Sequence, residues 1–404
     1  MRITKVKPFL VSSISMGDWV VVKIETDEGI SGFGDATIEQ NHRTIGAAVE
    51  VLERYLVGEN PFRIEHLWQR MYRSPYWRGG PILNTAISGI EHALWDIVGK
   101  ALKQPVYNLL GGPCREKIRL YSYAAGSDSE TMAENARRVV KKEGYTAVKT
   151  NPFIPPIRNT TVDGKAKQMM EGYRLDDAVK KAVKNVEAIR NAVGDRVDIM
   201  LDCHGRSSMS ALPTAYLVLL CKELEPLRPL WIEEPVRPDC TGSLAAFASK
   251  VRIPIAVGER LYTKFQFTAV IDKQMVNVVQ PDLSHAGGIL ECKKIAAMAE
   301  AHDILVAPHC PFFYSPIATA VAYQFDACTP NFLIQENDNV FKRGMIGNEW
   351  LIEPFKVENG FRMLPTEPGL GINVKEDLLP KYPYKEPTRM GTGVIAEDGA
   401  LADT

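Results

Sequence analysis

The chain has 404 residues, of which 45% are hydrophobic and 24% are charged, and its formal net charge is −1. This composition is typical of a globular protein and excludes wholesale disorder, and the balanced charge does not indicate binding to nucleic acid or to an anionic membrane. The longest apolar run, Ala215–Cys221, is far shorter than the roughly 18 residues that span a bilayer. Seven scattered cysteines without a C-x-x-C pair indicate reduced thiols in a cytoplasmic protein.

The first 120 or so residues predict an α+β domain. Residues 19–26 are a strand candidate, 27–29 a turn and 30–34 a second extended segment, which together indicate a hairpin. An amphipathic helix follows, because apolar residues recur at spacings of three and four: Leu83, Ile87, Ile90, Leu94 and Ile97. Strands followed by helices are typical of this fold class.

From about residue 118, short apolar strands alternate with helical segments. The eight strand candidates are Ile118–Ala124, Thr146–Lys149, Asp198–Asp202, Leu230–Glu233, Pro254–Gly258, Val276–Gln280, Ile304–Ala307 and Asn331–Gln335. Regular alternation predicts parallel strands with helical crossovers, and eight such strands fit a closed barrel; a doubly wound open sheet is the competing fold. The long polar connection 151–174 is typical of a functional lid or a mobile loop.

Carboxylates end or directly follow three consecutive strand candidates: Asp202, Glu233 and Glu259. Because the carboxyl ends of barrel strands form the face where active sites are built, we expect these side chains to meet. Three carboxylates repel unless a cation neutralises them, and oxygen ligands favour Mg²⁺ first and Mn²⁺ second. Any one of them alone could simply cap the next helix. Of the adjacent pair, we expect Glu233 to be the ligand and Glu234 to make a salt bridge.

Acid–base candidates follow the neighbouring strands. Asp282 closely follows the sixth candidate and His309 follows the seventh, so a carboxylate should lie beside an imidazole, fix its tautomer and raise its basicity. His204, two residues after Asp202, is a second acid–base candidate. For His285, a role at the entry of a helix or in support of the site residues is as open as an acid–base role.

The sequence resembles the mandelate racemase subgroup of the enolase superfamily, and its acid-sugar dehydratases, the galactonate dehydratases above all. The matching stretches are Tyr76–Ile82, Ala93–Ile97, Leu201–Arg206, Ile232–Val236, Gly258–Arg260, Gln280–Gly288 and Ala307–Pro311. The resemblance implies a modified (β/α)₇β barrel over residues 121–355, and an N-terminal α+β capping domain over 1–120 that is completed by a C-terminal return over 356–404.

The resemblance also implies a reaction. One Mg²⁺ per subunit would bind Asp202, Glu233 and Glu259, while His309, oriented by Asp282, removes the proton alpha to a substrate carboxylate. Glu336, protonated or bridged, could hydrogen-bond a carboxylate oxygen, and the family's acid, here His204, would protonate the leaving β-hydroxyl. The expected product is a 2-keto-3-deoxy acid formed from an aldonate such as D-galactonate, and the expected assembly is a homo-oligomer.

Substrate-binding candidates lie around this site. Racemases of the subgroup carry a Lys-x-Lys pair after the second strand, whereas this chain has Lys149 and then Asn151. Asparagine cannot move a proton, so a two-base racemase is disfavoured. Asn151 is expected to bind substrate hydroxyls, and Lys149 is a second substrate-binding candidate. Three further candidates complete the set. Trp19 lies at the loop before the N-terminal hairpin, and Arg260 directly follows Glu259. Tyr314 belongs to the aromatic run 312–314, which stands where a Leu-Gly-Pro run is expected.

Two other functions stay open. An epimerase or cycloisomerase would use the same metal and the same His309–Asp282 base, but it needs no acid over the β-hydroxyl, so the loss of His204 should spare its activity. A scaffold or regulatory protein could have kept the fold and lost catalysis, although an intact set of ligands argues against it.

Overall fold

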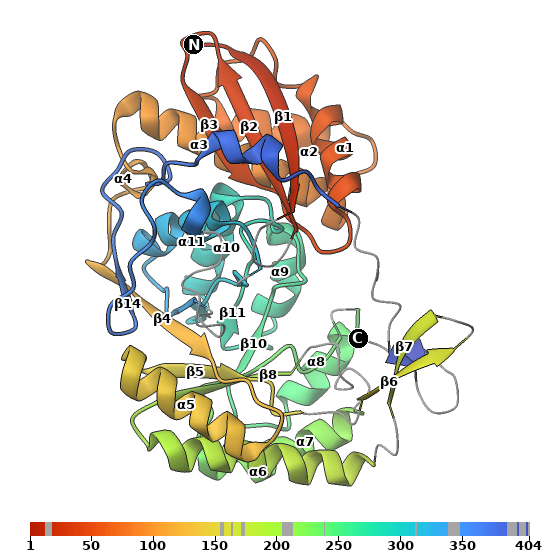
Figure 1. Ribbon diagram of the computed structural model, residues 1–404. Helices are drawn as coiled ribbons and strands as arrows, with labels where there is room; N and C mark the ends of the chain where they lie inside the picture. Colours follow the sequence, from red (N-terminus) through yellow and green to blue (C-terminus); the bar gives the residue numbers. More distant parts are fainter. Residues whose placement is uncertain are drawn as a thin grey trace.

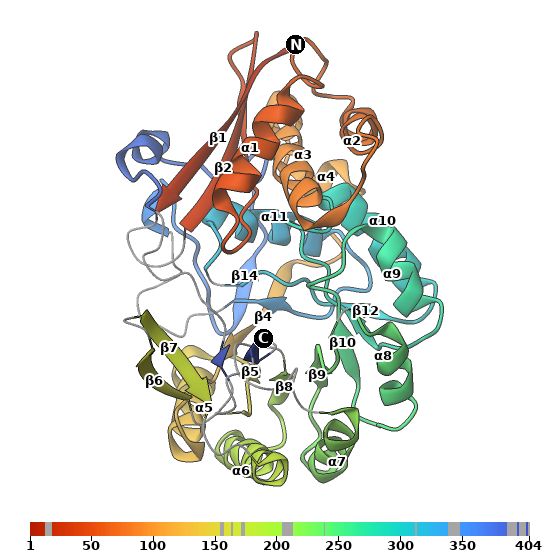
Figure 2. The same cartoon turned by 90° about the vertical axis from the view of Figure 1, so that its right-hand side faces the viewer.

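The computed structural model describes residues 1–12, 18–153, 157–162, 165–170, 174–203, 213–237, 239–311, 313–337, 348–385, 394–395 and 401–402. An N-terminal domain of strands and helices stands above a larger domain in which strands alternate with helices (Figure 1). Figure 2, turned by 90°, shows the same two layers from the side.

The N-terminal domain has a three-stranded antiparallel sheet with helices packed on it. Its strands, in sheet order, are β1 (Ile3–Ser12), β2 (Asp18–Thr26) and β3 (Ser31–Asp35). Its helices are α1 (His42–Glu53), α2 (Ile64–Arg73), α3 (Gly80–Leu102) and α4 (Val106–Leu109). The predicted hairpin of β2 and β3 and the predicted helix α3 are therefore confirmed.

Helix α3 is the central element of this domain, since every residue from Asn84 to Gly99 is buried. Its predicted apolar face packs in the hydrophobic core. Strand β3 approaches α3 so closely that a Cβ placed on Gly34 would lie 1.8 Å from the carbonyl oxygen of Gly89. Glycine is therefore required at position 34. The other side of α3 carries buried polar residues, which the sequence analysis did not single out.

The larger domain is a closed barrel of eight parallel strands. They are β4 (Lys117–Tyr123), β5 (Ala147–Thr150), β8 (Asp198–Asp202), β9 (Trp231–Glu233), β10 (Ile255–Val257), β11 (Val278–Val279), β12 (Leu305–Val306) and β13 (Gln335–Glu336). The ring closes because Val306 of β12 pairs in parallel with Phe332, just before β13, while β13 pairs with β4. The closed barrel is thus confirmed over the open sheet.

Helices connect successive barrel strands and complete the predicted (β/α)₇β order. They are α5 (Ser129–Glu143), α6 (Leu175–Val193), α7 (Thr214–Leu224), α8 (Thr241–Ala248), α9 (Thr263–Ile271), α10 (Ile289–Glu300) and α11 (Pro316–Ala327). Inside the ring, a buried layer takes one residue from each strand or its immediate flank: Tyr121, Ala147, Met200, Trp231, Ala256, Val278, Ala307 and Ile334. The barrel interior is therefore a packed core.

The connection 151–174 contains a hairpin that the sequence analysis missed. Strands β6 (Ile157–Val162) and β7 (Lys165–Met170) pair antiparallel and lie beside the barrel (Figures 1 and 2). Near the C-terminus, β15 (Val394–Ile395) pairs with β7 and with β16 (Leu401–Ala402). The pairing partner of the hairpin is more than 200 residues away, so local sequence patterns cannot reveal the sheet.

The C-terminal segment also contacts the N-terminal domain. The backbone N–H of Ser12 donates to the carbonyl of Tyr382 at 3.0 Å, that of Tyr384 donates to Leu10 at 3.1 Å, and Lys23 pairs with Glu376. Before this return, β14 (Phe361–Met363) pairs antiparallel with β4. Short 3₁₀ turns span Glu225–Leu227, Asn348–Trp350 and Glu376–Lys381.

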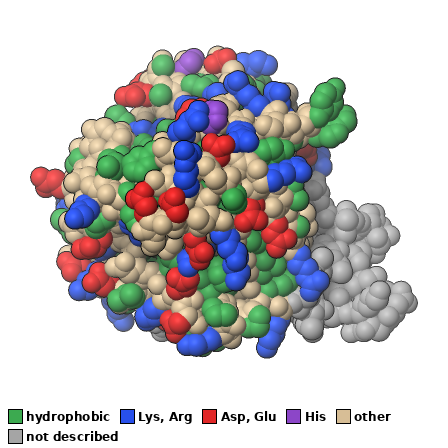
Figure 3. Space-filling model, turned by 90° about the horizontal axis from the view of Figure 1, so that it is seen from above, with side chains coloured by type: hydrophobic (Ala, Val, Ile, Leu, Met, Phe, Trp, Pro, Cys, Tyr) green, Lys and Arg blue, Asp and Glu red, His purple; other side chains and the backbone are tan. Residues whose placement is uncertain are grey.

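Acidic and basic side chains are interspersed over the face of the molecule seen from above (Figure 3), in keeping with the net charge of −1. Within the described ranges, no helix combines the length and the apolar character needed to cross a membrane.

Candidate active site

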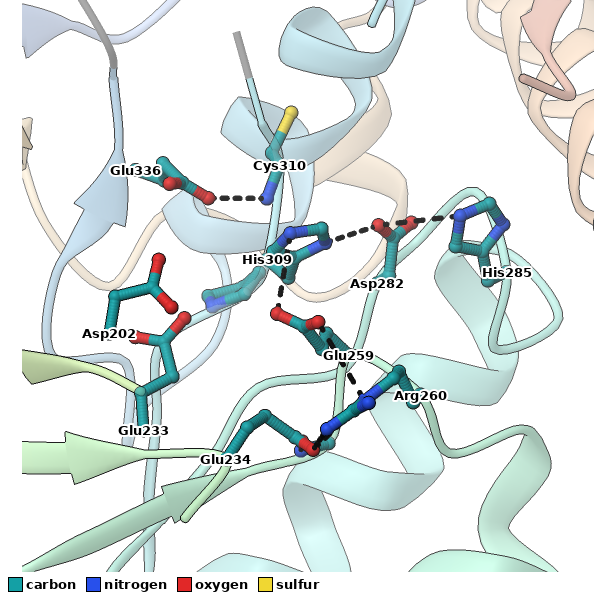
Figure 4. A network of polar contacts seen from close by, with 12 residues as sticks. Asp202, Glu233, Glu234, Glu259, Arg260, Asp282, His285, His309, Cys310 and Glu336 are labelled. Atoms are coloured by element: carbon teal, nitrogen blue, oxygen red, sulfur yellow. Dashed lines mark hydrogen bonds and ion pairs between the residues drawn. The ribbon is translucent and has the colours of Figure 1, made fainter. Parts of the chain in front are cut away.

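The predicted carboxylates lie at or just after the carboxyl ends of neighbouring barrel strands. Asp202 ends β8 and pairs in register with Glu233, which ends β9. Glu259 follows β10 by two residues, and Glu336 ends β13. Figure 4 shows Asp202 and Glu233 side by side, with Glu259 below the ring of His309. These carboxylates therefore lie at one end of the barrel, where the strand pattern in the sequence predicts them.

Lys149 of β5 lies among three of these carboxylates. Its Nζ is 2.8 Å from Glu336 Oε1, 3.0 Å from Glu233 Oε1 and 3.4 Å from Asp202 Oδ2. Burial disfavours the ammonium form, but the charges of Glu233 and Glu336 outweigh this effect and hold the pKa of Lys149 well above its usual value. We call these four residues the Lys149 cluster.

His309 and Asp282 form a hydrogen-bonded dyad. The Nδ1 of His309 is 2.7 Å from Asp282 Oδ2, and its Nε2 is 3.6 Å from Glu259 Oε2. Burial acts to lower the pKa of His309, but Glu259 and Asp282 outweigh it and raise that pKa to about 9. Burial likewise acts to raise the pKa of Asp282, yet His285 and His309 bring it below its usual value. The dyad is therefore a carboxylate that orients an imidazole.

Glu336 connects the two parts of the site. It contacts Lys149, and its Oε2 accepts a hydrogen bond from the backbone N–H of Cys310 at 3.3 Å (Figure 4). Burial raises the pKa of a carboxyl group, but Lys149 and His309 reverse the effect and lower the pKa of Glu336. Glu336 is therefore held as a carboxylate, and of the two forms expected from the sequence the bridged one fits this structure.

Glu234 makes the salt bridge that was predicted for it. Both Nε and Nη2 of Arg260 donate to Glu234 Oε2, at 3.2 and 2.9 Å, and Glu234 Oε1 accepts from the backbone N–H of Gly258 at 2.8 Å. Arg260, expected to bind substrate, is thus engaged with Glu234 in this structure.

The other substrate-binding candidates lie around the strand ends. Asn151 follows β5, and its Oδ1 accepts from the backbone N–H of Phe153 at 2.9 Å. The indole of Trp19 is 1% exposed and donates to the carbonyl of Phe313 at 2.9 Å. Tyr314 is 5% exposed, and its hydroxyl lies 2.5 Å from His285 Nε2. His204 lies outside the described residues, so its predicted role stays a prediction.

Four polar residues of α3 were missed by the sequence analysis: Thr85, Ser88, Glu91 and His92. We call them the inner polar face of α3, because all are buried and all bond to residues 283–290, directly after Asp282. A signal was present in the sequence, since positions 85, 88 and 92 share one side of a helix. The opposite side of the helix carries the apolar residues, whose spacing is the stronger signal.

The residue types fit a hard divalent cation, since three carboxylates converge from consecutive strands. In this structure positive charge at these carboxylates comes from Lys149 and His309. Among the residues that the structure describes, no group of three or more His, Cys, Asp or Glu side chains is already arranged to hold a metal ion. The donor chemistry therefore supports the predicted ligand set, and the set itself stays a prediction.

The fold and the site define an enolase-like enzyme. Residues 2–111 match the family model "Mandelate racemase / muconate lactonizing enzyme, N-terminal domain", and residues 131–378 match "Enolase C-terminal domain-like". The chain belongs to this family of enzymes.

Similar proteins include dehydratases. The D-galactonate dehydratase of Variovorax paradoxus (strain S110) is 42% identical over 407 residues, which cover 100% of both chains. That of Verminephrobacter eiseniae (strain EF01-2) is 41% identical over 383 residues, 94% of each chain. Among solved structures, a candidate dehydratase from Mesorhizobium loti has a TM-score of 0.84 and 34% identity, covering 95% of this chain and 99% of that one. The resemblance seen in the sequence is thus confirmed.

Proposed function

We propose that this protein is a hydro-lyase that removes water from a sugar acid, with D-galactonate as the leading substrate. Two D-galactonate dehydratases at 41% and 42% identity support the proposal. The observation that carries it is the orientation of His309, whose Nδ1 is bonded to Asp282 while Nε2 lies toward the carboxylate of Glu259. Nε2 is therefore the ring atom available for proton transfer at the strand ends.

We propose that Asp202, Glu233 and Glu259 bind one Mg²⁺ per subunit, with Mn²⁺ as the alternative. When bound, the ion would supply positive charge that favours the enediolate of the substrate. Titration calorimetry with Mg²⁺ alone tests this ligand set: Glu259→Gln should weaken binding strongly. Unchanged affinity would remove Glu259 from the set, whatever the substrate proves to be.

In the proposed reaction, the neutral form of His309 takes the proton alpha to the carboxylate at Nε2, and the electron pair of the broken C–H bond moves to the carboxyl group. The enediolate then expels the β-hydroxyl, which His204 protonates so that it leaves as water. The enol tautomerises to a 2-keto-3-deoxy acid. Because Glu336 is ionised, Lys149, bonded to it at 2.8 Å, is the better hydrogen-bond donor to a substrate carboxylate.

The first test is a panel of aldonic and aldaric acids, incubated with the purified protein and Mg²⁺, with 2-keto-acid product measured by its semicarbazone absorbance. We expect turnover of D-galactonate or of one or two of its epimers. If no keto acid forms, exchange of the alpha proton in heavy water becomes the readout. If exchange occurs without elimination, an epimerase or cycloisomerase replaces the proposal. If neither signal is seen, the protein is one that has lost catalysis.

His204→Asn separates the two acid–base roles. Elimination should stop in this variant, because hydroxide is a poor leaving group, while alpha-proton exchange at His309 continues. Retained keto-acid formation would remove His204 from the reaction, and the loss of both signals would contradict separate roles.

We also propose a cytoplasmic homo-oligomer. All seven cysteines are free thiols, as expected in a reducing compartment. Light scattering of the purified protein measures its mass in solution, and a mass equal to one chain would contradict the assembly.

A further inference from the structure

Behind the dyad lies a second histidine, His285, both of whose ring nitrogens are engaged. Its Nε2 is 2.5 Å from the hydroxyl of Tyr314 and 3.8 Å from Asp282 Oδ2, and its Nδ1 is 2.9 Å from Thr85 Oγ1. Figure 4 shows Asp282 between the rings of His309 and His285. These contacts connect α3 of the N-terminal domain to the catalytic end of the barrel.

Tyr314 completes the connection between His285 and His309. Its ring meets the ring of His309 edge-on, with centroids 6.2 Å apart and an interplanar angle of 90°. Tyr314 belongs to the segment after β12, which also carries His309, so the hydroxyl bond to His285 ties that segment to the one after β11, which carries Asp282. The two strand ends that supply the dyad are therefore joined by a side-chain contact.

The same region is anchored to the N-terminal domain at several points. The inner polar face of α3 holds residues 283–290: Ser88 Oγ accepts from the N–H of Gly287 at 3.0 Å, and Glu91 accepts from Leu290 at 2.9 Å. The carbonyl of Phe313, next to Tyr314, accepts from the indole of Trp19 at 2.9 Å. Asp282 and His309 thus occupy segments that another domain holds in place.

We propose that Thr85, His285 and Tyr314 form a histidine relay that positions the dyad. The relay fixes the separation of the two segments and the tilt of the His309 ring, so that Nε2 stays directed toward the alpha proton. These are positioning residues, since a Tyr314 side chain that is 5% exposed and bonded through its hydroxyl has little surface left for a substrate. The inference rests on the proposed function for its kinetic readout only.

Thr85 allows a matched test far from the substrate. Thr85→Val removes the hydroxyl while preserving the shape, and Thr85→Ser keeps the hydroxyl. We expect kcat to fall about tenfold in Thr85→Val and in Tyr314→Phe, the effect of one buried hydrogen bond, with KM unchanged within about twofold. Thr85→Ser, which keeps the hydroxyl, should retain the kcat of the wild-type protein. The double variant Thr85→Val/Tyr314→Phe should be about as slow as either single variant. Either substitution already interrupts the chain of contacts, so the second adds little.

A proton NMR measurement gives a readout that needs no turnover. The downfield signal of the His309 Nδ1–H, assigned by its loss in His309→Gln, should shift or broaden in Thr85→Val and in Tyr314→Phe. It should be unchanged in Thr85→Ser and in Tyr107→Phe, a control at a buried tyrosine that packs against Ala327 and Cys328.

Several outcomes would overturn the relay. An unchanged kcat together with an unchanged NMR signal in both test variants would show that the contacts do not position His309. A raised KM with normal kcat in Tyr314→Phe would make Tyr314 a substrate contact. If the wild-type protein turns over none of the sugar acids, the proposed function fails, and the NMR comparison still decides the relay.

Discussion

The Lys149 cluster and the His309–Asp282 dyad lie at the same end of one barrel, yet they are held in different ways. The cluster consists of strand-end residues of the barrel, held together by opposite charges around one ammonium group. The dyad stands on two segments that α3 and Trp19 of the N-terminal domain anchor by hydrogen bonds. The barrel alone thus assembles the anionic part of the site, whereas the segments that carry the dyad are also bonded to a second domain.

The largest expected effect separates the two parts. Asp282→Asn replaces the carboxylate that accepts from His309 Nδ1 by an amide, which favours the wrong tautomer of the imidazole. We expect kcat to fall about a thousandfold, while calorimetry finds Mg²⁺ affinity within about threefold of wild type. A parallel loss of metal affinity would show that the dyad and the cluster are one unit.

Lys149→Met tests the charge balance of the cluster. Removing one partner of a buried ion pair leaves uncompensated charge, so unfolding in urea should show a loss of about 3–5 kcal/mol. The control Lys264→Met also removes an ion pair, but Glu291 keeps Lys294 at 3.5 Å, and we expect a loss of about 1 kcal/mol or less. Equal losses in the two variants would contradict a special role for Lys149.

Glu91 tests the interface between the domains through pH. Burial raises the pKa of Glu91 from 4.5 to about 7, although the backbone N–H groups of Leu290 and Ile289 oppose the shift. A raised folded pKa contributes stability that is complete below pH 4.5 and is lost as the pH rises through 7.

Glu91→Gln removes this titration. Relative to the variant, the wild-type protein should lose on the order of 3 kcal/mol of unfolding free energy between pH 4 and pH 8. Urea unfolding of both proteins at the two pH values measures the difference. A constant difference across this range would show that Glu91 has an ordinary pKa.

The smallest expected effect concerns Arg260. Arg260→Lys keeps the positive charge but loses the two N–H groups of the guanidinium that donate hydrogen bonds to Glu234. We expect about 1 kcal/mol of lost stability with KM unchanged. A several-fold rise in KM at unchanged stability would instead make Arg260 the substrate contact that the sequence analysis expected.

How far the sequence predicted the site depends on the kind of signal. Asp202, Glu233 and Glu336 could be placed because each ends a strand, and the strands were visible as short apolar runs. Lys149 was expected to bind substrate, and its place among three carboxylates was not foreseen, since sequence does not give side-chain distances. His285 was left open because neither of its partners, Thr85 and Tyr314, is a neighbour in the sequence.

By itself, the sequence determined the alternation of strands and helices, the apolar face of α3 and the residues that end each barrel strand. These properties follow from local periodicity, which dictates the direction of each side chain within its own element. The tertiary structure alone decided the closure of the barrel at Val306 and Phe332, the sheet between the hairpin β6–β7 and the C-terminal strands, and the contact of Thr85 with His285, 200 positions away. Such contacts depend on how distant segments pack. The sequence around a polar helix residue does not indicate which distant residue becomes its hydrogen-bond partner.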